Sequence, residues 1–144
     1  MQCQEGEIMA KVLNYGMVGG GPDAFIGDAH RRAISLDESA RLVAGVFSRN
    51  AEKSKKMGEV LHIEEERCYK DYETMALEEA KREDGIDFVV VVTPNASHYE
   101  ICKAFLNAGI HVVCDKPVTT TYEKAVELQK LAEEKSLLFM VTYT

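Results

Sequence analysis

Apolar runs alternate with amphipathic segments along the chain from Lys11 onward. Apolar runs bounded by turn residues predict strands, and apolar residues three or four positions apart predict the buried face of a helix. Strands are therefore expected at residues 12–18, 42–47, 86–92, 110–114 and 137–143, with a short strand near 67–69. Helices are expected at residues 24–34, 51–57, 71–82, 96–107 and from 120 to about 135. Strands that alternate with helices are typical of a parallel α/β sheet.

The ends of the predicted helices carry residues that favour helix starts and stops. Gly58 is expected to end the second helix, and Asp71 is expected to cap the start of the third. Thr120 and Glu123 have the spacing of a capping box before the last helix. The apolar positions of the first helix that we expect to face the sheet are Phe25, Ile26, Ala29, Ala33 and Ile34.

The unbroken run of valines at 89–92 predicts a central strand that is covered on both faces. Together these patterns predict an α/β fold of the Rossmann type, a doubly wound parallel sheet in three αβα layers. We expect one dinucleotide-binding domain over residues 11–144, preceded by a polar extension at residues 1–10. A chain of 144 residues can bury roughly 68–70% of its unfolded surface, enough for a substantial core.

Charge and composition exclude several kinds of partner. The net charge of −7 and the scattered Lys and Arg residues argue against a nucleic-acid partner, which requires a basic face. No apolar stretch is long enough to span a membrane, and the polar, acidic first residues lack the pattern of a signal peptide. We therefore expect a cytoplasmic protein without a nucleic-acid or membrane partner.

The four cysteines form neither a CxxC pair nor a disulfide framework. They are Cys3, Cys68, Cys102 and Cys114, and the last two lie in apolar runs where free cysteine behaves as a small buried hydrophobe. His98 and Cys102 are four positions apart, as two metal ligands on one helix face can be, but no further ligand pair accompanies them. We expect no metal and a reducing environment.

A glycine-rich turn, Gly19-Gly20-Gly21, follows the first predicted strand and precedes the first helix. Glycines allow the backbone to approach a pyrophosphate closely, and the N-terminus of the following helix attracts the negative charge. The third position of the G-x-G-x-x-G/A pattern falls on Ala24, or on Gly27 if the turn is longer. We expect the carboxylate of Asp23 to point away from the phosphates. The cofactor-binding residues predicted here are Gly19, Gly20, Gly21, Ala24, Phe25, Ile26 and Gly27.

The second predicted strand ends at Ser48 and Arg49, where this fold contacts the adenine ribose. A carboxylate at that tip favours NAD, whereas an arginine with small polar neighbours accommodates the 2′-phosphate of NADP. Ser48 stands where an acid would favour NAD, and Arg49 can pair with a phosphate. We predict NADP in preference to NAD; the alternative for these residues is an ordinary solvated turn.

Two polar segments interrupt the later apolar strands at their carboxyl ends, where open α/β sheets bind their ligands. The first contains Thr93, Pro94, Asn95 and His98, and the second is Asp115-Lys116-Pro117. With these segments in place, the chain resembles the family of glucose–fructose oxidoreductase, inositol dehydrogenase and MocA-type oxidoreductases. The resemblance extends over residues 12–144 and rests on the glycine turn, the Thr-Pro-Asn-x-x-His segment and the acid-Lys-Pro motif in that order.

The resemblance implies a role for each matching residue. Lys116 corresponds to the motif lysine and would be catalytic, lying near the nicotinamide and the reacting carbon. Asp115 replaces the family's usual glutamate, which puts its contact in doubt, and His30 fits a histidine of the family's first helix. The residues implied to lie beside the cofactor are Thr93, Pro94, Asn95, His98, Asp115, Lys116 and Pro117. Taken singly, Lys116 could be a surface lysine and His98 a packing or capping residue.

Members of this family continue into a second α/β domain, which supplies a catalytic histidine, much of the substrate pocket and oligomer contacts. The resemblance therefore implies a longer, homo-oligomeric parent that transfers hydride between NAD(P) and a hydroxyl-bearing sugar, polyol or related small molecule. We expect the 144-residue chain to be a truncated cofactor domain rather than a natural short protein, and to bind cofactor without efficient turnover. The alternative is a non-enzymatic NAD(P)-binding regulatory or redox-sensing module.

Overall fold

Five parallel strands form the sheet in the computed structural model, which describes residues 10–143. The strands are β1 Leu13–Gly19, β2 Ala40–Val46, β3 Phe88–Val92, β4 His111–Asp115 and β5 Phe139–Thr142. They lie in the order β2-β1-β3-β4-β5, and every neighbouring pair is parallel. The predicted Rossmann-type α/β fold is confirmed. The predicted extension and Cys3 fall mainly or wholly outside the described residues.

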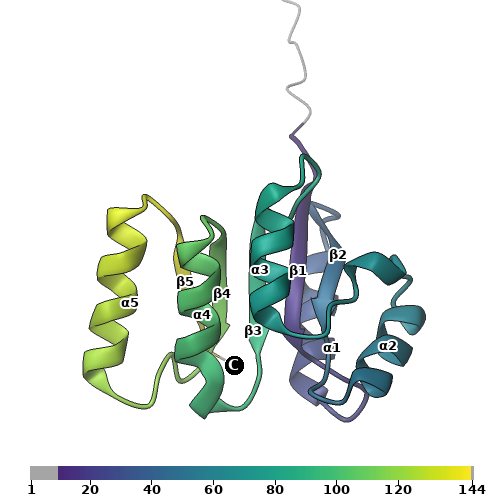
Figure 1. Ribbon diagram of the computed structural model, residues 1–144, viewed down its shortest axis with the longest axis horizontal. Helices are drawn as coiled ribbons and strands as arrows, with labels where there is room; N and C mark the ends of the chain where they lie inside the picture. Colours follow the sequence, from purple (N-terminus) through teal and green to yellow (C-terminus); the bar gives the residue numbers. More distant parts are fainter. Residues whose placement is uncertain (1–9, 144) are drawn as a thin grey trace, which may run out of the picture.

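Helices cover both faces of this sheet, as Figure 1 shows. The helices α3, α4 and α5 lie in front of it in that view, and α1 lies behind β1. The helices are α1 Phe25–Ser35, α2 Ala51–Val60, α3 Tyr72–Lys81, α4 His98–Asn107 and α5 Tyr122–Glu134, with the short 3-10 turns η1 Glu65–Arg67 and η2 Asn95–Ser97. With helices on both faces of the sheet, the domain has the predicted three αβα layers.

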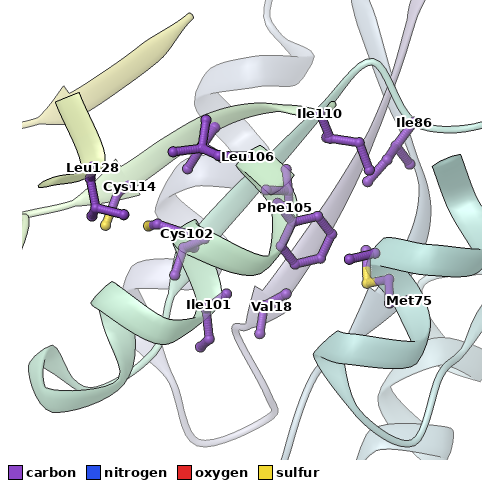
Figure 2. Close-up of a cluster of buried hydrophobic side chains, with 14 of the residues drawn as sticks. Val18, Met75, Ile86, Ile101, Cys102, Phe105, Leu106, Ile110, Cys114 and Leu128 are labelled. Atoms are coloured by element: carbon purple, nitrogen blue, oxygen red, sulfur yellow. The ribbon is translucent and has the colours of Figure 1, made fainter. Parts of the chain in front are cut away.

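Alternate residues of the central strand β3 enter two separate apolar clusters. Val89 and Val91 belong to the cluster beneath α3, α4 and α5, part of which Figure 2 shows. Val90 and Val92 belong to the opposite cluster, against which Ile26 of α1 packs. Successive side chains of a strand point to opposite faces, so a strand buried on both faces reads as an unbroken apolar run. The prediction made from the valine run is confirmed.

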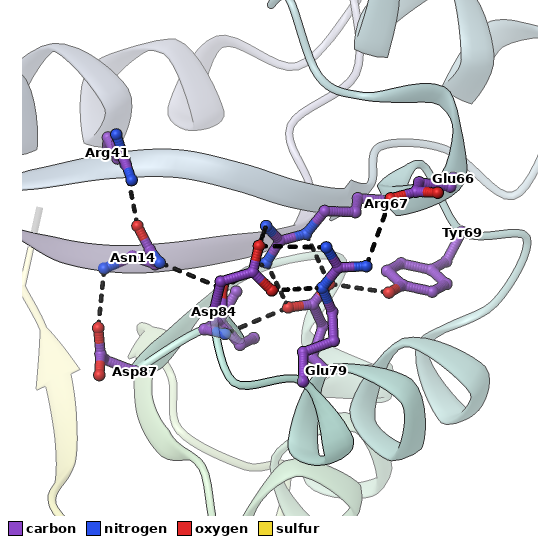
Figure 3. A network of polar contacts seen from close by, with 10 residues as sticks. Asn14, Arg41, Glu66, Arg67, Tyr69, Glu79, Asp84 and Asp87 are labelled. Carbon is purple, nitrogen blue, oxygen red and sulfur yellow. Dashed lines mark hydrogen bonds and ion pairs between the residues drawn. The ribbon is translucent and has the colours of Figure 1, made fainter.

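The amino edge of the sheet holds a network of paired charges (Figure 3). Arg67 is 4% exposed and donates to both carboxylate oxygens of Glu79, at 3.0 and 2.6 Å. Glu79 also accepts hydrogen bonds from the hydroxyl of Tyr69 and the backbone N–H of Ile86. Arg67 donates further to the carbonyl oxygen of Asp84. Each buried charge therefore has several partners, as burial in a low-dielectric interior requires.

Three local predictions at helix ends and at the short strand are wrong. Gly58 does not end α2, which continues to Val60. The glycine instead makes room for Cys68, whose sulfur would lie only 2.8 Å from a Cβ at this position. Thr121, not Thr120, caps α5 by accepting from the N–H of Lys124. The segment 67–69 forms a single parallel bridge, from Cys68 to Gly45, after the turn η1.

In the first helix, two of the residues that were expected to face the sheet are exposed instead. Phe25 is 85% exposed, and Ala33 is exposed as well. Phe25 is the first residue of α1, and its side chain points into solvent while Ile26 and Ile34 pack on the sheet.

None of the helices within residues 10–143 is long and apolar enough to cross a membrane. Within the same residues, no group of three or more His, Cys, Asp or Glu could hold a metal ion.

Candidate functional site

A cleft of about 660 Å³ opens where the strand order reverses. The chain runs outward from β1 to β2 on one side, and β3 lies on the other side of β1. Loops that leave two neighbouring parallel strands in opposite directions create a crevice between them, which is where open α/β sheets bind ligands. The predicted site residues that line the cleft are Gly19, Gly20, Gly21, Ala24, Ser48, Arg49, Thr93 and Pro94.

The glycine turn brings the backbone of β1 close to its neighbours. Gly19 has a φ of +94°, a conformation that side chains other than glycine rarely adopt. A Cβ on Gly19 would also lie 2.8 Å from the carbonyl oxygen of Val92 in β3. A Cβ on Gly21 would lie 2.7 Å from the carbonyl oxygen of Phe47. The turn is therefore packed between the ends of β3 and β2, and only glycine fits.

The third glycine position is resolved in favour of Gly27. It is buried in α1, and a Cβ there would overlap the Cα of Gly20. This contact lets the first turn of α1 pack directly on the glycine turn, which is the role of the third glycine in dinucleotide-binding folds. Ala24 lines the cleft and is the non-helical residue before α1. The exposed carboxylate of Asp23 lines the cleft and lies 3.4 Å from the Lys53 ammonium, so its expected direction away from the phosphates stays a prediction.

Arg31 is a component of this site that the sequence analysis missed. Its guanidinium lies behind the turn, where Nη1 donates to the carbonyl oxygen of Gly20 at 3.0 Å and contacts the sulfur of Met17 at 3.3 Å. The Arg31 side chain is only 13% exposed, and its carboxylate contact, to Asp28, is long at 4.0 Å. A largely buried positive charge therefore lies directly against the glycine turn. No motif distinguishes Arg31 in the sequence from the adjacent Arg32, which has the same charge but is exposed.

The end of β2 forms the second wall of the cleft. The N–H of Asn50 donates to the Ser48 hydroxyl at 3.1 Å, and Asn50 in turn caps α2 by accepting from the N–H of Lys53. These local bonds fix the turn that presents Ser48 and Arg49 to the cleft. Arg49 and Lys53 together give this wall two cationic side chains.

A third wall comes from the segment between the Cys68 bridge and α3, which was not predicted as part of the site. Its cleft-lining residues are Lys70, Asp71, Tyr72 and Glu73. Burial, together with the neighbouring Glu73, raises the pKa of Tyr72 to about 12, so its ring is a neutral wall at physiological pH. The parallel bridge from Cys68 to Gly45 brings this segment beside β2. In the sequence, the predicted strand near 67–69 was the one feature that indicated that this segment lies beside the sheet.

The loop after β3 is held by its own side chains. The hydroxyl of Ser97 lies 2.7 Å from the Thr93 Oγ1 and 2.7 Å from the carbonyl oxygen of Pro94. Thr93, Pro94 and Ser97 line the cleft, whereas Asn95 is exposed and does not. The loop therefore presents Thr93 and Pro94 opposite the glycine turn.

His98 joins this loop to the one that follows β4. It is 1% exposed, with Nε2 lying 2.8 Å from the carbonyl oxygen of Thr93 and Nδ1 lying 2.7 Å from that of Pro117. Both ring nitrogens are thus engaged by backbone oxygens, so His98 does not form a metal site with Cys102. Cys102 and Cys114 are both free and buried, and Figure 2 shows their sulfurs facing each other.

The acid-Lys-Pro motif lies at the carboxyl end of β4, beyond the residues that line the cleft. Asp115 Oδ1 accepts from the hydroxyl of Thr142 at 3.2 Å and lies 3.6 Å from Nε2 of the buried His30. Lys116 and Pro117 are exposed, and the peptide bond between them is cis. The predicted residues outside the cleft lining are thus Phe25, Ile26, Gly27, Asn95, His98, Asp115, Lys116 and Pro117.

The cleft fits a dinucleotide on three grounds. The glycine turn packs against the ends of β3 and β2, and because Gly19 and Gly21 have no side chains, no Cβ covers its backbone. Arg31 places a buried cation behind the turn, where a pyrophosphate carries negative charge. The walls at Arg49 and Tyr72 combine a cation with an aromatic surface, as an adenosine phosphate requires.

Comparison with known proteins agrees with this geometry. The family profile described as an oxidoreductase family with an NAD-binding Rossmann fold matches residues 13–143. The uncharacterized oxidoreductase YfiI of Bacillus subtilis is 47% identical over 137 residues, covering 94% of this chain and 35% of the relative. The scyllo-inositol 2-dehydrogenase (NADP(+)) of the same organism is 43% identical over 65 residues, covering 45% of this chain and 18% of that protein.

Among solved structures, an inositol dehydrogenase homolog from Azotobacter vinelandii in complex with NADH and myo-inositol superimposes with a TM-score of 0.90. It is 42% identical and covers 93% of this chain, which in turn covers 35% of that protein. The chain thus spans about a third of the length of the relatives it matches. It belongs to the NAD-binding oxidoreductase family of glucose–fructose oxidoreductase, inositol dehydrogenase and MocA.

Proposed function

We propose that this chain is the cofactor domain of an oxidoreductase that transfers hydride between NAD(P) and a hydroxyl-bearing sugar, polyol or related compound. The observation that carries the proposal is the glycine turn, packed against β3 and α1 and backed by Arg31, at the mouth of the cleft. The substrate class is supported by the similar Azotobacter structure, which holds myo-inositol. A small-molecule substrate and a homo-oligomeric parent are part of this proposal.

The nicotinamide cofactor, when bound, accepts or donates the hydride. Lys116 would orient the substrate hydroxyl, because a fixed ammonium can hydrogen-bond that oxygen and stabilise the negative charge that develops on it. Lys116 is exposed beside the loop that His98 anchors, so it is accessible to a substrate bound outside this domain. Asp115 would position the motif through its hydrogen bond from Thr142 on β5.

The test of Lys116 compares Lys116→Ala with the unchanged protein, in a form long enough to turn over a polyol. We expect turnover to fall by about 100-fold or more, in the range for a positioned proton-transfer or oxyanion-stabilising group, while NAD(P)H still binds. Unchanged turnover would remove the catalytic role and favour the alternative, a regulatory or redox-sensing module. The exposed Lys130 on α5 gives a matched control, Lys130→Ala.

NADP is the cofactor that we propose for this site. Ser48 and Arg49 form the wall at the end of β2, Lys53 adds a second cation, and the related scyllo-inositol dehydrogenase bears NADP(+) in its name. Arg49→Gln should weaken NADPH binding about tenfold, the equivalent of one lost phosphate contact of about 1.4 kcal/mol, and leave NADH binding nearly unchanged. Lys56→Gln, on the exposed side of α2, is the control. Equal losses for both cofactors would contradict the assignment.

The 144-residue chain itself should bind cofactor without efficient turnover, because residues that shape a substrate pocket are expected beyond it. The measurement is absorbance of reduced cofactor when the chain is mixed with NADP⁺ and a panel of polyols and sugars. A brisk rate from this chain alone would overturn the expectation.

A further inference from the structure

His98 occupies an unusual position for a buried histidine, between two backbone oxygens of different loops. It begins α4, and its imidazole lies between the loop after β3 and the loop after β4. Nε2 is 2.8 Å from the carbonyl oxygen of Thr93, and Nδ1 is 2.7 Å from that of Pro117. At 1% exposure, His98 has almost no contact with solvent.

These contacts constrain the protonation of the ring. A carbonyl oxygen can only accept a hydrogen bond, so each ring nitrogen must donate to be satisfied. Neutral imidazole carries one N–H, and its other nitrogen would turn a lone pair toward a carbonyl oxygen in a buried site. Only the imidazolium form donates from both nitrogens. The two contacts therefore favour a positively charged ring at His98.

The titratable groups around His98 come from two elements. Cys114 of β4 interacts electrostatically with His98, and Cys102, one turn along α4, interacts in the same way with Cys114. The negative charge of Asp115, next to Cys114, raises the pKa of that thiol. Burial alone would lower the pKa of His98, but the interaction with Cys114 and the contacts with the two carbonyl oxygens raise it to about 9. The neighbouring Cys102 thiol and the nearby His98 lower the pKa of Cys114, although burial opposes this.

We infer that His98 is a positioning residue, an imidazolium clamp that ties the cleft-lining loop at Thr93 to the loop that carries Lys116 and Pro117. The two loops leave neighbouring strands β3 and β4, and each supplies one carbonyl oxygen to the same ring. The clamp fixes the distance between the wall of the cofactor cleft and the motif lysine. Its effect on Lys116 rests on the proposed function, whereas its protonation and its grip on the loops do not.

The direct test is a pH titration of the chain labelled with ¹⁵N at its histidines, read by NMR of the ring nitrogens. We expect both His98 nitrogens to be protonated at pH 8 and to lose a proton near pH 9. His62, which is exposed, is the internal reference. A neutral, single-tautomer His98 ring at pH 8 would overturn the inference. No cofactor or turnover enters this measurement, so its result stands apart from the fate of the proposed function.

A matched pair of variants tests the clamp itself. His98→Asn keeps a donor near the Nδ1 position and loses the one toward Thr93, whereas His62→Asn makes the same change at an exposed site with a φ of +57° that asparagine tolerates. In His98→Asn, amide hydrogen exchange in the two loops should quicken about tenfold or more, and NADPH should bind about three- to tenfold more weakly. His62→Asn should match the unchanged chain.

Unchanged hydrogen exchange in both loops of folded His98→Asn would contradict the clamp. If that variant does not fold, the ring-nitrogen titration of the unchanged chain still decides the protonation. If no form of the chain binds NADPH but the exchange difference appears, the proposed function fails and the clamp stands.

Discussion

Two buried arginines at opposite edges of the sheet have opposite surroundings. Arg67, at the amino edge, is held by both oxygens of Glu79, the nearer at 2.6 Å (Figure 3). Arg31, at the carboxyl edge, donates to a carbonyl oxygen and a sulfur, and its carboxylate contact is 4.0 Å long. The guanidinium of Arg67 is closely paired with a carboxylate, whereas that of Arg31, beside the glycine turn, is not.

The difference separates stability from binding. A buried charge that is fully paired serves the fold, and losing its partner leaves an uncompensated ion in a low-dielectric interior. A buried cation without a close carboxylate still repels other cations and attracts anions, which suits a site for a pyrophosphate. The amino edge should therefore govern unfolding, and the carboxyl edge should govern cofactor affinity.

The largest expected effect is on stability, from Glu79→Ala. Removing one partner of a buried pair typically costs about 3–5 kcal/mol of unfolding free energy, because the remaining charge is stranded. Urea unfolding followed by circular dichroism measures it. Glu78→Ala on the same helix removes an exposed partner of Lys81 and should cost less than about 1 kcal/mol. Equal losses of unfolding free energy in the two variants would show that the Arg67–Glu79 pair does not govern stability.

Gly27→Val should abolish cofactor binding, raising the Kd for NADPH by about 100-fold or more. The valine side chain would collide with Gly20 and displace α1 from the glycine turn. Titration of NADPH, with the melting temperature measured in parallel, separates lost binding from lost fold. Ala33→Val, at an exposed position of α1, is the control. NADPH affinity retained in Gly27→Val would show that the turn is not the phosphate site.

Arg31→Met should weaken NADPH binding about tenfold, or about 1.4 kcal/mol, and reduce the salt dependence of the Kd. Methionine fills similar apolar space without the charge, so the unfolding free energy should change little. Arg32→Met is a close control, because the neighbouring Arg32 is 81% exposed and paired with Asp28 at 2.8 Å. If both variants bind NADPH alike, Arg31 has no role in the carboxyl-edge site.

The smallest expected effect is a pH step from His98. The pKa of this residue in the folded chain, about 9, lies above its unfolded value near 6.5, so the clamp's stabilisation is fully present below pH 6.5 and is lost as pH rises through 9. Between pH 8 and 10 the unchanged chain should lose about 1 kcal/mol more unfolding free energy than His98→Asn. Parallel pH profiles for the two proteins would contradict the assignment.

The fold was predictable because its signals are local and repeated. The valine run of β3, the glycine turn and the Asp71 cap each specify a conformation through nearby residues alone. The misplaced details depend on tertiary contacts: Gly58 is a packing glycine inside its helix, where Cys68, ten positions away, lies against it. Phe25 was assigned to the sheet by periodicity, although it is the first residue of α1 and its side chain is exposed.

The site was predictable where a motif marks a strand end and hidden where distant residues meet. The glycines, Ser48, Arg49, Thr93 and Pro94 line one cleft as expected. Arg31 and the wall at Lys70–Glu73 were missed, since their roles come from folding α1 and the Cys68 bridge onto the cleft. The meeting of His98 with Pro117 likewise joins two loops that the sequence presents separately.

Calorimetric titration of the folded 144-residue chain with NADPH tests the central claim most directly. The account predicts saturable one-to-one binding to the unchanged chain, weaker binding to Arg31→Met, and none to Gly27→Val. A folded chain that shows no saturable binding at NADPH concentrations up to about 1 mM, equivalent to less than about 4 kcal/mol, would contradict it.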